Sequence, residues 1–244
     1  MAHTAGLVPA LQGRIGRPRS GDIVTGADNS RVIASLLEHL RHHYPEAGHH
    51  YWSVRCWGLL IWQPVVLGLA AVHLGGCALR FTNLGQQAGD GIVAGYSLPD
   101  QPLQPGSESR LIAQAAYEIR SLGDPLLEQL AGLVRINPVL ARRLLADRVL
   151  ATLLHLQAES QQPDNDALHD LARCWLTALD LDGASDLMSI DRPGGGQRLA
   201  LDRKGCCQHY RRLDGGLCST CPRLARAERI ERLQLEWSDH AGTE

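Results

Sequence analysis

The sequence predicts an α+β protein that is mainly helical, with a small antiparallel sheet and a cysteine-rich loop near its C-terminus. Three observations lead to this prediction. Apolar residues recur at helical spacing through most of the 244 residues. Strand-like composition is confined to a stretch around residues 77–98 and to residues 197–202. Four of the seven cysteines lie within sixteen residues, from Cys206 to Cys221.

The chain divides into three parts by composition. Residues 1–22 contain Gly, Pro and Arg but lack the apolar core of a secretory signal, so we expect a loose leader. Residues 23–190 are expected to form the main, mainly helical domain. Residues 191–194 read Asp-Arg-Pro-Gly and open a short loop or linker, so residues 191–244 are expected to form a C-terminal segment with a final helix.

The first helix of the main domain is expected to begin at Asn29 or Ser30 and to end at Pro45. The next apolar stretch, from Cys56 to Leu74, is about as long as a membrane span. Because Pro64 lies at its middle, we expect a buried pair of helical segments kinked there. A membrane span is the alternative.

The remaining elements follow in order. Residues 77–83 and 91–98 flank a Gly/Gln-rich turn and are expected to form a hairpin. Helices are expected to begin at Ser107, at Asp124-Pro125 and at Asn137-Pro138, the last running to about Glu159. Further elements are expected as a helix over residues 166–181, a strand over residues 197–202 and a helix over residues 222–238 whose N-terminus faces the cysteines.

Composition and motifs exclude several classes of function. A net charge of −2 with no basic stripe leaves no electrostatic footprint for nucleic acid. The chain contains no P-loop, dinucleotide fingerprint or nucleophile elbow. We therefore expect no bound nicotinamide or flavin.

The cysteine spacing Cys-Cys-x10-Cys-x2-Cys indicates a metal site rather than disulfides, because nothing in the chain suggests secretion. The turn from Cys218 to Cys221 would suit tetrahedral zinc. An adjacent pair suits it poorly, because adjacent residues of an extended chain point to opposite faces. Gly205 is expected to help the backbone bend there. A two-iron cluster is a wider target with four thiolate ligands, so it is favoured, and zinc stays open.

The run from Arg203 to Arg211, followed by residues 215–222, resembles the C-terminal [2Fe-2S] domain of the FhuF-type ferric-siderophore reductases. The resemblance covers roughly residues 197–224, with a weaker likeness around residues 55–64. It implies a [2Fe-2S] cluster as cofactor, and the four implied ligands are Cys206, Cys207, Cys218 and Cys221. It also implies that residues 23–190 bind the substrate and that single electrons pass to chelated ferric iron, which is released as ferrous iron.

The resemblance implies partners and further site residues. The substrate would be a ferric siderophore, with the hydroxamate type favoured, and the electrons would come from a ferredoxin-like or other protein donor. The protein would be cytoplasmic, with peripheral contact with the inner membrane left open. The candidate residues for substrate contact or cluster tuning are Arg55, Trp57, Trp62, His209 and Tyr210.

Two other functions remain open. The chain could be a non-enzymatic [2Fe-2S] electron carrier or a sensor of iron or redox state, or it could be a zinc-stapled binding module. His39, His42 and His43 have metal-ligand spacing on one helical face, but an exposed polar face is the simpler interpretation. Cys56, Cys77 and Cys174 lie in apolar surroundings and are expected to be buried, reduced core residues.

Overall fold

The computed structural model describes residues 11–160, 164–192 and 195–241. Its longer helices are α2 (Ser30–His43), α3 (Gly48–His73), α4 (Glu108–Ala131), α5 (Pro138–Ser160), α6 (Asn165–Ala178) and α7 (Arg226–Ala241), with short 3-10 helices η1 (Pro45–Ala47) and η2 (His209–Arg211). Its strands are β1 (Gly13–Ile15), β2 (Ile23–Val24), β3 (Cys77–Ala78), β4 (Gly85–Gly89), β5 (Ile92–Leu98), β6 (Gln104–Pro105), β7 (Asp186–Asp191) and β8 (Gln197–Asp202). The predicted mainly helical α+β class is confirmed.

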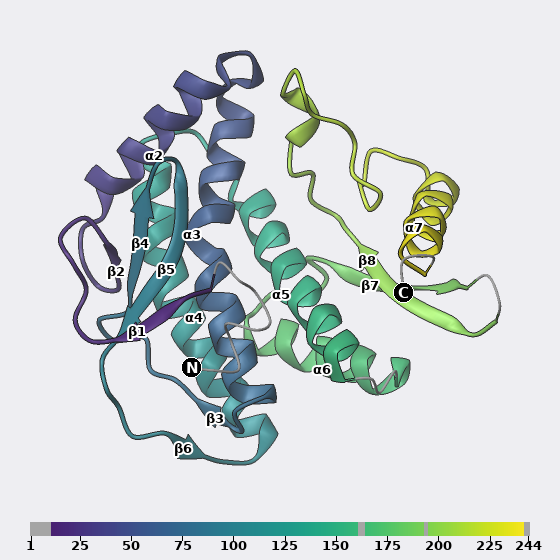
Figure 1. Cartoon of the computed structure of the whole chain (residues 1–244), viewed down its shortest axis with the longest axis horizontal. Coiled ribbons are helices and arrows are strands. Elements are labelled where there is room, and N and C mark those ends of the chain that lie inside the picture. Colours follow the sequence, from purple (N-terminus) through teal and green to yellow (C-terminus); the bar gives the residue numbers. More distant parts are fainter. Residues whose placement is uncertain (1–10, 161–163, 193–194, 242–244) are drawn as a thin grey trace.

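Helix α3 forms the centre of the molecule. Figure 1 shows the four-stranded sheet on one side of α3 and α5 on the other, and α3 packs against both α4 and α5. Most residues of α3 are buried, including Trp57 and Gln63. A helix that is apolar all round is expected where neighbours cover every face.

The expected pair of helical segments is wrong, because α3 is a single helix with Pro64 inside it, whereas the expected burial is confirmed. Proline cannot donate the hydrogen bond that the carbonyl of Leu60 would normally accept. The buried side chain of Gln86 on β4 takes that place, donating from Nε2 to the Leu60 oxygen at 3.0 Å. A residue of the sheet therefore satisfies the carbonyl that the proline leaves free.

The same helix bears on the question of a membrane span. Among the described residues, the stretch Pro45–His73 alone is long and apolar enough to cross a membrane, judged by length and composition. Its most apolar window is 78% buried inside the protein. The buried window is what is expected of a core helix.

The prediction for a second proline, Pro125, is also wrong. Asp124-Pro125 does not begin a helix, because α4 continues through it from Glu108 to Ala131. Ser121, whose carbonyl loses its helical donor, is exposed, so water can replace the missing bond. Asn137 does start α5 as predicted, since its Oδ1 accepts from the backbone amides of Val139 and Leu140.

The hairpin lies later in the chain than expected. Its strands are β4 and β5, and the turn is Asp90-Gly91, where both residues have positive φ. The Gly/Gln-rich stretch predicted as a turn is strand β4, and residues 77–78 pair with β6 instead. The Asp-Gly dipeptide was the available signal, because it is typical of tight hairpin turns.

Part of the expected leader belongs to the sheet, whose strand order is β1-β5-β4-β2. Strand β1 pairs in parallel with β5, and Leu11 is fully buried. Residues 11–15 are therefore integrated into the fold, which corrects this part of the expectation. Residues 1–10 lie outside the described residues.

Strands β7 and β8 form an antiparallel hairpin that precedes the cysteines, and β7 was not anticipated. Leu187 and Leu199 face the main core, whereas Met188 and Ala200 form a small second cluster with Leu233 of α7. The hairpin thus lies between the helical body and α7 (Figure 1). It crosses the expected domain boundary at residues 190 and 191.

Candidate metal centre

The cysteines lie on a long loop that connects β8 to α7. The backbone of the loop is held against the helical body, because the side chain of Arg143 on α5 donates to the carbonyl of Lys204 at 3.2 Å. Gly205 approaches α5 so closely that a Cβ there would lie 3.1 Å from the Cβ of Arg143. Gly205 does not have a positive φ, so its role is close packing rather than the bend expected from the sequence.

The bend follows the adjacent cysteines instead. Gln208 adopts a left-handed conformation with φ 60°. The backbone amide of Gln208 interacts with the thiol of Cys206, and the amide of His209 interacts with the thiol of Cys207. Successive amides aimed at sulfur atoms stabilise thiolates, as cluster ligands require.

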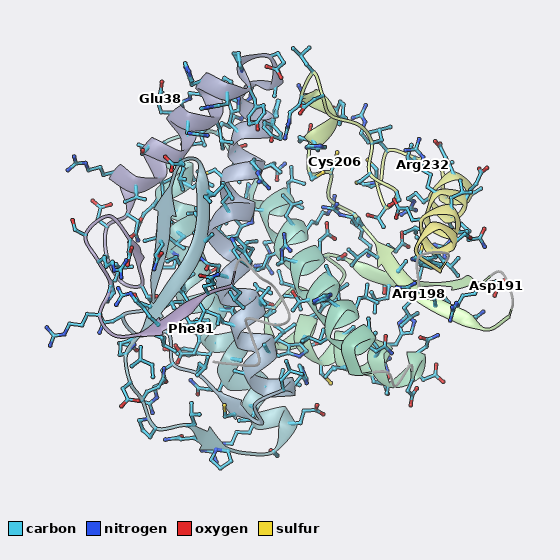
Figure 2. All side chains as sticks on the ribbon, in the orientation of Figure 1. Glu38, Phe81, Asp191, Arg198, Cys206 and Arg232 are labelled. Carbon is cyan, nitrogen blue, oxygen red and sulfur yellow. The ribbon has the colours of Figure 1, made fainter. Side chains whose placement is uncertain are left out.

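The four thiols come together as two pairs. The side chain of Cys207 interacts with that of Cys218, and Cys206 interacts with Cys221. Within the described part of the chain, no three Cys, His, Asp or Glu side chains are close enough to share one metal ion. Figure 2 shows Cys206 in the segment between the helical body and α7, where Arg232 is labelled.

This pairing fits a two-iron cluster better than one zinc ion. A single tetrahedral ion needs all four sulfurs around one point. A [2Fe-2S] cluster is a wider target that takes four cysteine thiolates, and the structure brings all four thiols together. The donor set and the amide contacts therefore fit the group that the cysteine spacing implies.

The thiols of one pair have opposite pKa shifts. The interaction with Cys218 is the main reason why the pKa of Cys207 falls to about 5, and the His209 amide and Arg203 lower it further against the effect of burial. The same interaction, together with burial, raises the pKa of Cys218.

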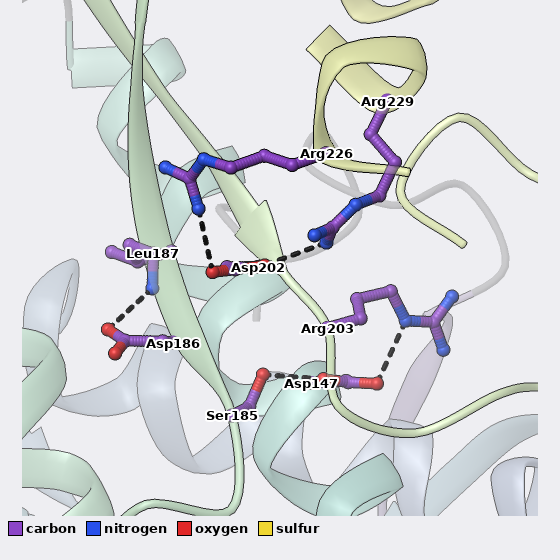
Figure 3. A network of polar contacts seen from close by, with 8 residues as sticks. All are labelled: Asp147, Ser185, Asp186, Leu187, Asp202, Arg203, Arg226 and Arg229. Carbon is purple, nitrogen blue, oxygen red and sulfur yellow. Dashed lines mark hydrogen bonds and ion pairs between the residues drawn. The ribbon is translucent and has the colours of Figure 1, made fainter. Parts of the chain in front are cut away.

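Arg203 lies between the cysteines and the core, and Figure 3 shows its ion pair with Asp147. Its Nε donates to Asp147 Oδ2 at 2.8 Å and its Nη1 lies 3.7 Å from the Sγ of Cys218. Asp147 is buried on α5 and also accepts from the buried hydroxyl of Ser185. Burial raises the pKa of Asp147, and the Arg203 charge opposes that rise.

Helix α7 closes the other side of the loop. The carboxylate of Asp202, at the end of β8, forms ion pairs with Arg226 at 3.2 Å and with Arg229 at 2.7 Å. Figure 3 shows both contacts. Arg232 donates to the carbonyl of Leu217 at 3.0 Å. Because α7 begins at Arg226, a turn separates it from Cys221, so the helix does not start directly after the last cysteine as predicted.

The tip of the loop reaches the short segment between α2 and α3 that contains η1. The guanidinium of Arg212 lies 4.2 Å from the ring centre of Tyr44, and the amide of Leu213 donates to Glu46. Tyr210 is half-buried with Arg223 over its ring, whereas the side chain of His209 is exposed. Of these two candidates, His209 acts on a cysteine through its backbone amide.

A cavity of about 440 Å³ adjoins Cys207. Arg55 and Trp62 of α3, which the sequence suggested as substrate-contacting or tuning residues, line it together with Arg203. Trp57 lies in the core instead, where its Nε1 donates to the carbonyl of Ala141 at 2.9 Å.

Asp147 and Arg148 also line this cavity, and the sequence predicted neither of them as a site residue. They lie on α5, far along the chain from both α3 and the cysteines. No local motif marks them. The packing of α5 against β8 brings them to the cysteine loop, and its packing against α3 brings them to Arg55.

The remaining candidates lie apart from the cysteines. Cys56 and Cys77 are buried, and burial raises the pKa of Cys56 to about 12. Cys174 is exposed, so its expected burial is wrong. His39 and His43 stack at 3.9 Å, but no third ligand joins them among the described residues.

Comparison with known protein families supports the same conclusion. Residues 203–223 match the family model described as the FhuF 2Fe-2S C-terminal domain. The resemblance inferred from the cysteine spacing is confirmed over this segment. The cofactor of this segment is a [2Fe-2S] cluster.

Proposed function

We propose that this protein is a ferric-siderophore reductase. Single electrons pass through a [2Fe-2S] cluster held by Cys206, Cys207, Cys218 and Cys221 to chelated ferric iron, which is released as ferrous iron. The observation that supports this best is that Cys207 lines a cavity shared with α3 and α5. A ferric chelate bound in that cavity would lie directly beside the cluster.

The cluster and the chelated ferric ion each change their oxidation state by one electron. When bound, the cluster supplies one electron at a time. Ferric iron in a siderophore is held by hard oxygen ligands, which bind ferrous iron far more weakly. One electron therefore suffices to release the iron without breaking the chelator.

The chain's own residues would orient the substrate and adjust the cluster. Trp62 is half-buried, and its Nε1 donates to the carbonyl of Val93 at 2.7 Å, which fixes the ring as a wall of the cavity. Arg203 would stabilise the additional negative charge of the reduced cluster, since it reaches the Sγ of Cys218. Hydroxamates are the favoured chelators.

The electron donor would be another protein, because the sequence has no motif for a nicotinamide or flavin. Arg211 and Arg223 are exposed on the cysteine loop and flank the ring of Tyr210. Two exposed guanidinium groups would favour an acidic, ferredoxin-like donor. The reaction would take place in the cytoplasm.

The test begins with protein purified without oxygen, and iron, sulfide and zinc are counted before and after reduction. About two irons and two sulfides per chain would be expected, with an EPR signal on reduction. The reduced protein is then mixed with a ferric trihydroxamate and a ferrous-specific indicator. Reoxidation of the cluster should yield about one ferrous ion for each electron lost.

Matched serine variants identify the ligands. Cys206→Ser should lose the cluster spectrum and the turnover, whereas Cys174→Ser, at an exposed cysteine outside the loop, should keep both. An intact cluster that no ferric chelate reoxidises would overturn the proposal in favour of a carrier or sensor. A colourless protein with about one zinc would leave a structural module.

A further inference from the structure

We propose that the cavity beside Cys207 selects ferric chelates of net negative charge, and that Arg55 and Arg148 are the residues that select them. This inference rests on the proposed reductase function, because it concerns the same cavity. It goes further in assigning a charge to the outer surface of the substrate. The hydroxamate groups expected around the iron are compatible with it, since carboxylates elsewhere on the chelator would supply the charge.

The charged side chains of the cavity wall are mainly positive. Its charged lining residues are three arginines, Arg55, Arg148 and Arg203, against a single carboxylate, Asp147. They come from α3, from α5 and from the start of the cysteine loop. The structure thus places three positive charges around one opening beside Cys207.

One arginine of the cavity is already neutralised by an ion pair, and the other two are not. Arg203 is paired with Asp147 at 2.8 Å, and both side chains are largely buried. Arg55 and Arg148 are exposed, and within the described residues neither guanidinium has a hydrogen-bond or ion-pair partner. Two free guanidinium groups therefore remain available to a ligand.

The arginines around the cavity also repel one another. Although the side chain of Arg148 reaches solvent, the surrounding cavity wall desolvates it, and this is the main reason why its pKa is lowered. The charges of Arg203 and Arg55 lower the pKa further, and Asp147 opposes the change. The arginines are therefore close enough to destabilise one another. An anion between Arg55 and Arg148 would relieve this repulsion, which a neutral chelate cannot do.

The geometry of the groups suits oxygen anions. A guanidinium forms two parallel hydrogen bonds with a carboxylate and is weakly hydrated, so it is the usual partner for such groups. The arginines would also offset the repulsion between an anionic chelate and the negatively charged cluster. Trp62 supplies the apolar wall on which the body of the chelate can lie.

Redox-inert gallium(III) chelates separate binding from electron transfer. An anionic gallium complex of a citrate-based dihydroxamate is compared with a neutral gallium trihydroxamate by calorimetry on the cluster-loaded protein. We expect the anionic chelate to bind at least about tenfold more tightly, and added salt to reduce the difference. Equal affinities, or a preference for the neutral chelate, would overturn the inference.

The double variant Arg55→Gln/Arg148→Gln should lose most of this tenfold preference while binding the neutral chelate as before. Arg120→Gln, which removes an exposed arginine from α4 outside the cavity, is the matched control and should keep the preference. The cluster spectrum and the melting temperature show that each variant is folded. A double variant that retains the preference would show that residues other than Arg55 and Arg148 recognise the negative charge of the chelate.

Reduction of the corresponding ferric chelates is measured in parallel. If ferric chelates are reduced but anionic and neutral gallium chelates bind with equal affinity, this inference is overturned and the proposed function stands. Absence of turnover with every ferric chelate would overturn the proposed function itself.

Discussion

At the scale of single residues, the shape of the cysteine loop depends on Gly215. Its amide donates to the carbonyl of Arg212, and a Cβ at this position would overlap the carbonyl of His209. The amide of His209 is also one of the groups that interact with Cys207. A side chain at position 215 would therefore disturb the backbone that presents a cysteine.

We predict that Gly215→Ala lowers the yield of cluster-loaded protein several-fold, because the loop must shift to accept the methyl group. Gly216→Ala is the control, since a Cβ there would meet no atom within 4 Å. Iron content and visible absorbance after identical purification measure the effect. Equal loading of the two variants would contradict this account of the loop.

Arg203 and Asp147 allow a second prediction at this scale. Removing the positive charge in Arg203→Gln should lower the reduction potential of the cluster, because the reduced state is the more negative one. Removing the negative charge in Asp147→Asn should raise it. A redox titration followed by EPR measures both shifts, and Arg203→Lys, which keeps the charge, should lie between Arg203→Gln and the wild type. Shifts of the same sign in the two charge-removing variants would refute this electrostatic account.

At the scale of elements, α3 stays continuous because a strand compensates for its proline. Gln86 on β4 donates to the carbonyl of Leu60, and its own Oε1 accepts from Gln63. All of these groups are buried, so no water replaces them. The integrity of the helix and the position of the strand are therefore linked.

We predict that Gln86→Leu lowers the free energy of unfolding by about 1–3 kcal/mol, since it leaves a buried carbonyl without a donor. In a Pro64→Ala background the helix supplies its own amide to Leu60, so the same replacement should cost less. Gln87→Leu, at the less buried neighbouring position, is the control. Denaturant unfolding of the four proteins of this cycle, and of the control, measures the coupling, and additive effects would disprove it.

At the scale of the whole molecule, the large core does not depend on the cysteine loop. The core cluster draws its side chains from α2 to α6 and from the sheet, with only Leu187 and Leu199 contributed by the last hairpin. Of the four loop cysteines, only Cys221 is buried. The cluster therefore organises a peripheral segment.

Removing the cluster with an iron chelator under reducing conditions should accordingly leave most of the far-UV circular dichroism unchanged. Protease digestion should then cut first within residues 203–225, because this loop loses its metal cross-links. The Cys206→Ser variant should behave in the same way without any chelator. Cooperative loss of the helical signal together with the iron would contradict the separation of loop and core.

The sequence alone determined what is local in this protein. The spacing from Cys206 to Cys221 identified the cofactor, because a cluster's ligands are set by residue type and separation. One-sided apolar patterns predicted α2, and the cap at Asn137 predicted the start of α5, because both depend on near neighbours. The two internal prolines misled the prediction, because their effect depends on what lies opposite the freed carbonyl.

Only the tertiary structure decided what surrounds the cluster. Arg55 is a candidate from the sequence, but its cavity exists because α3, α5 and the loop after β8 meet beside Cys207. Arg148 and Asp147 carry no local signal, since their role arises from contacts between residues distant in the chain. Periodicity records which face of a helix is buried, but the identity of the neighbour is set by how the elements pack.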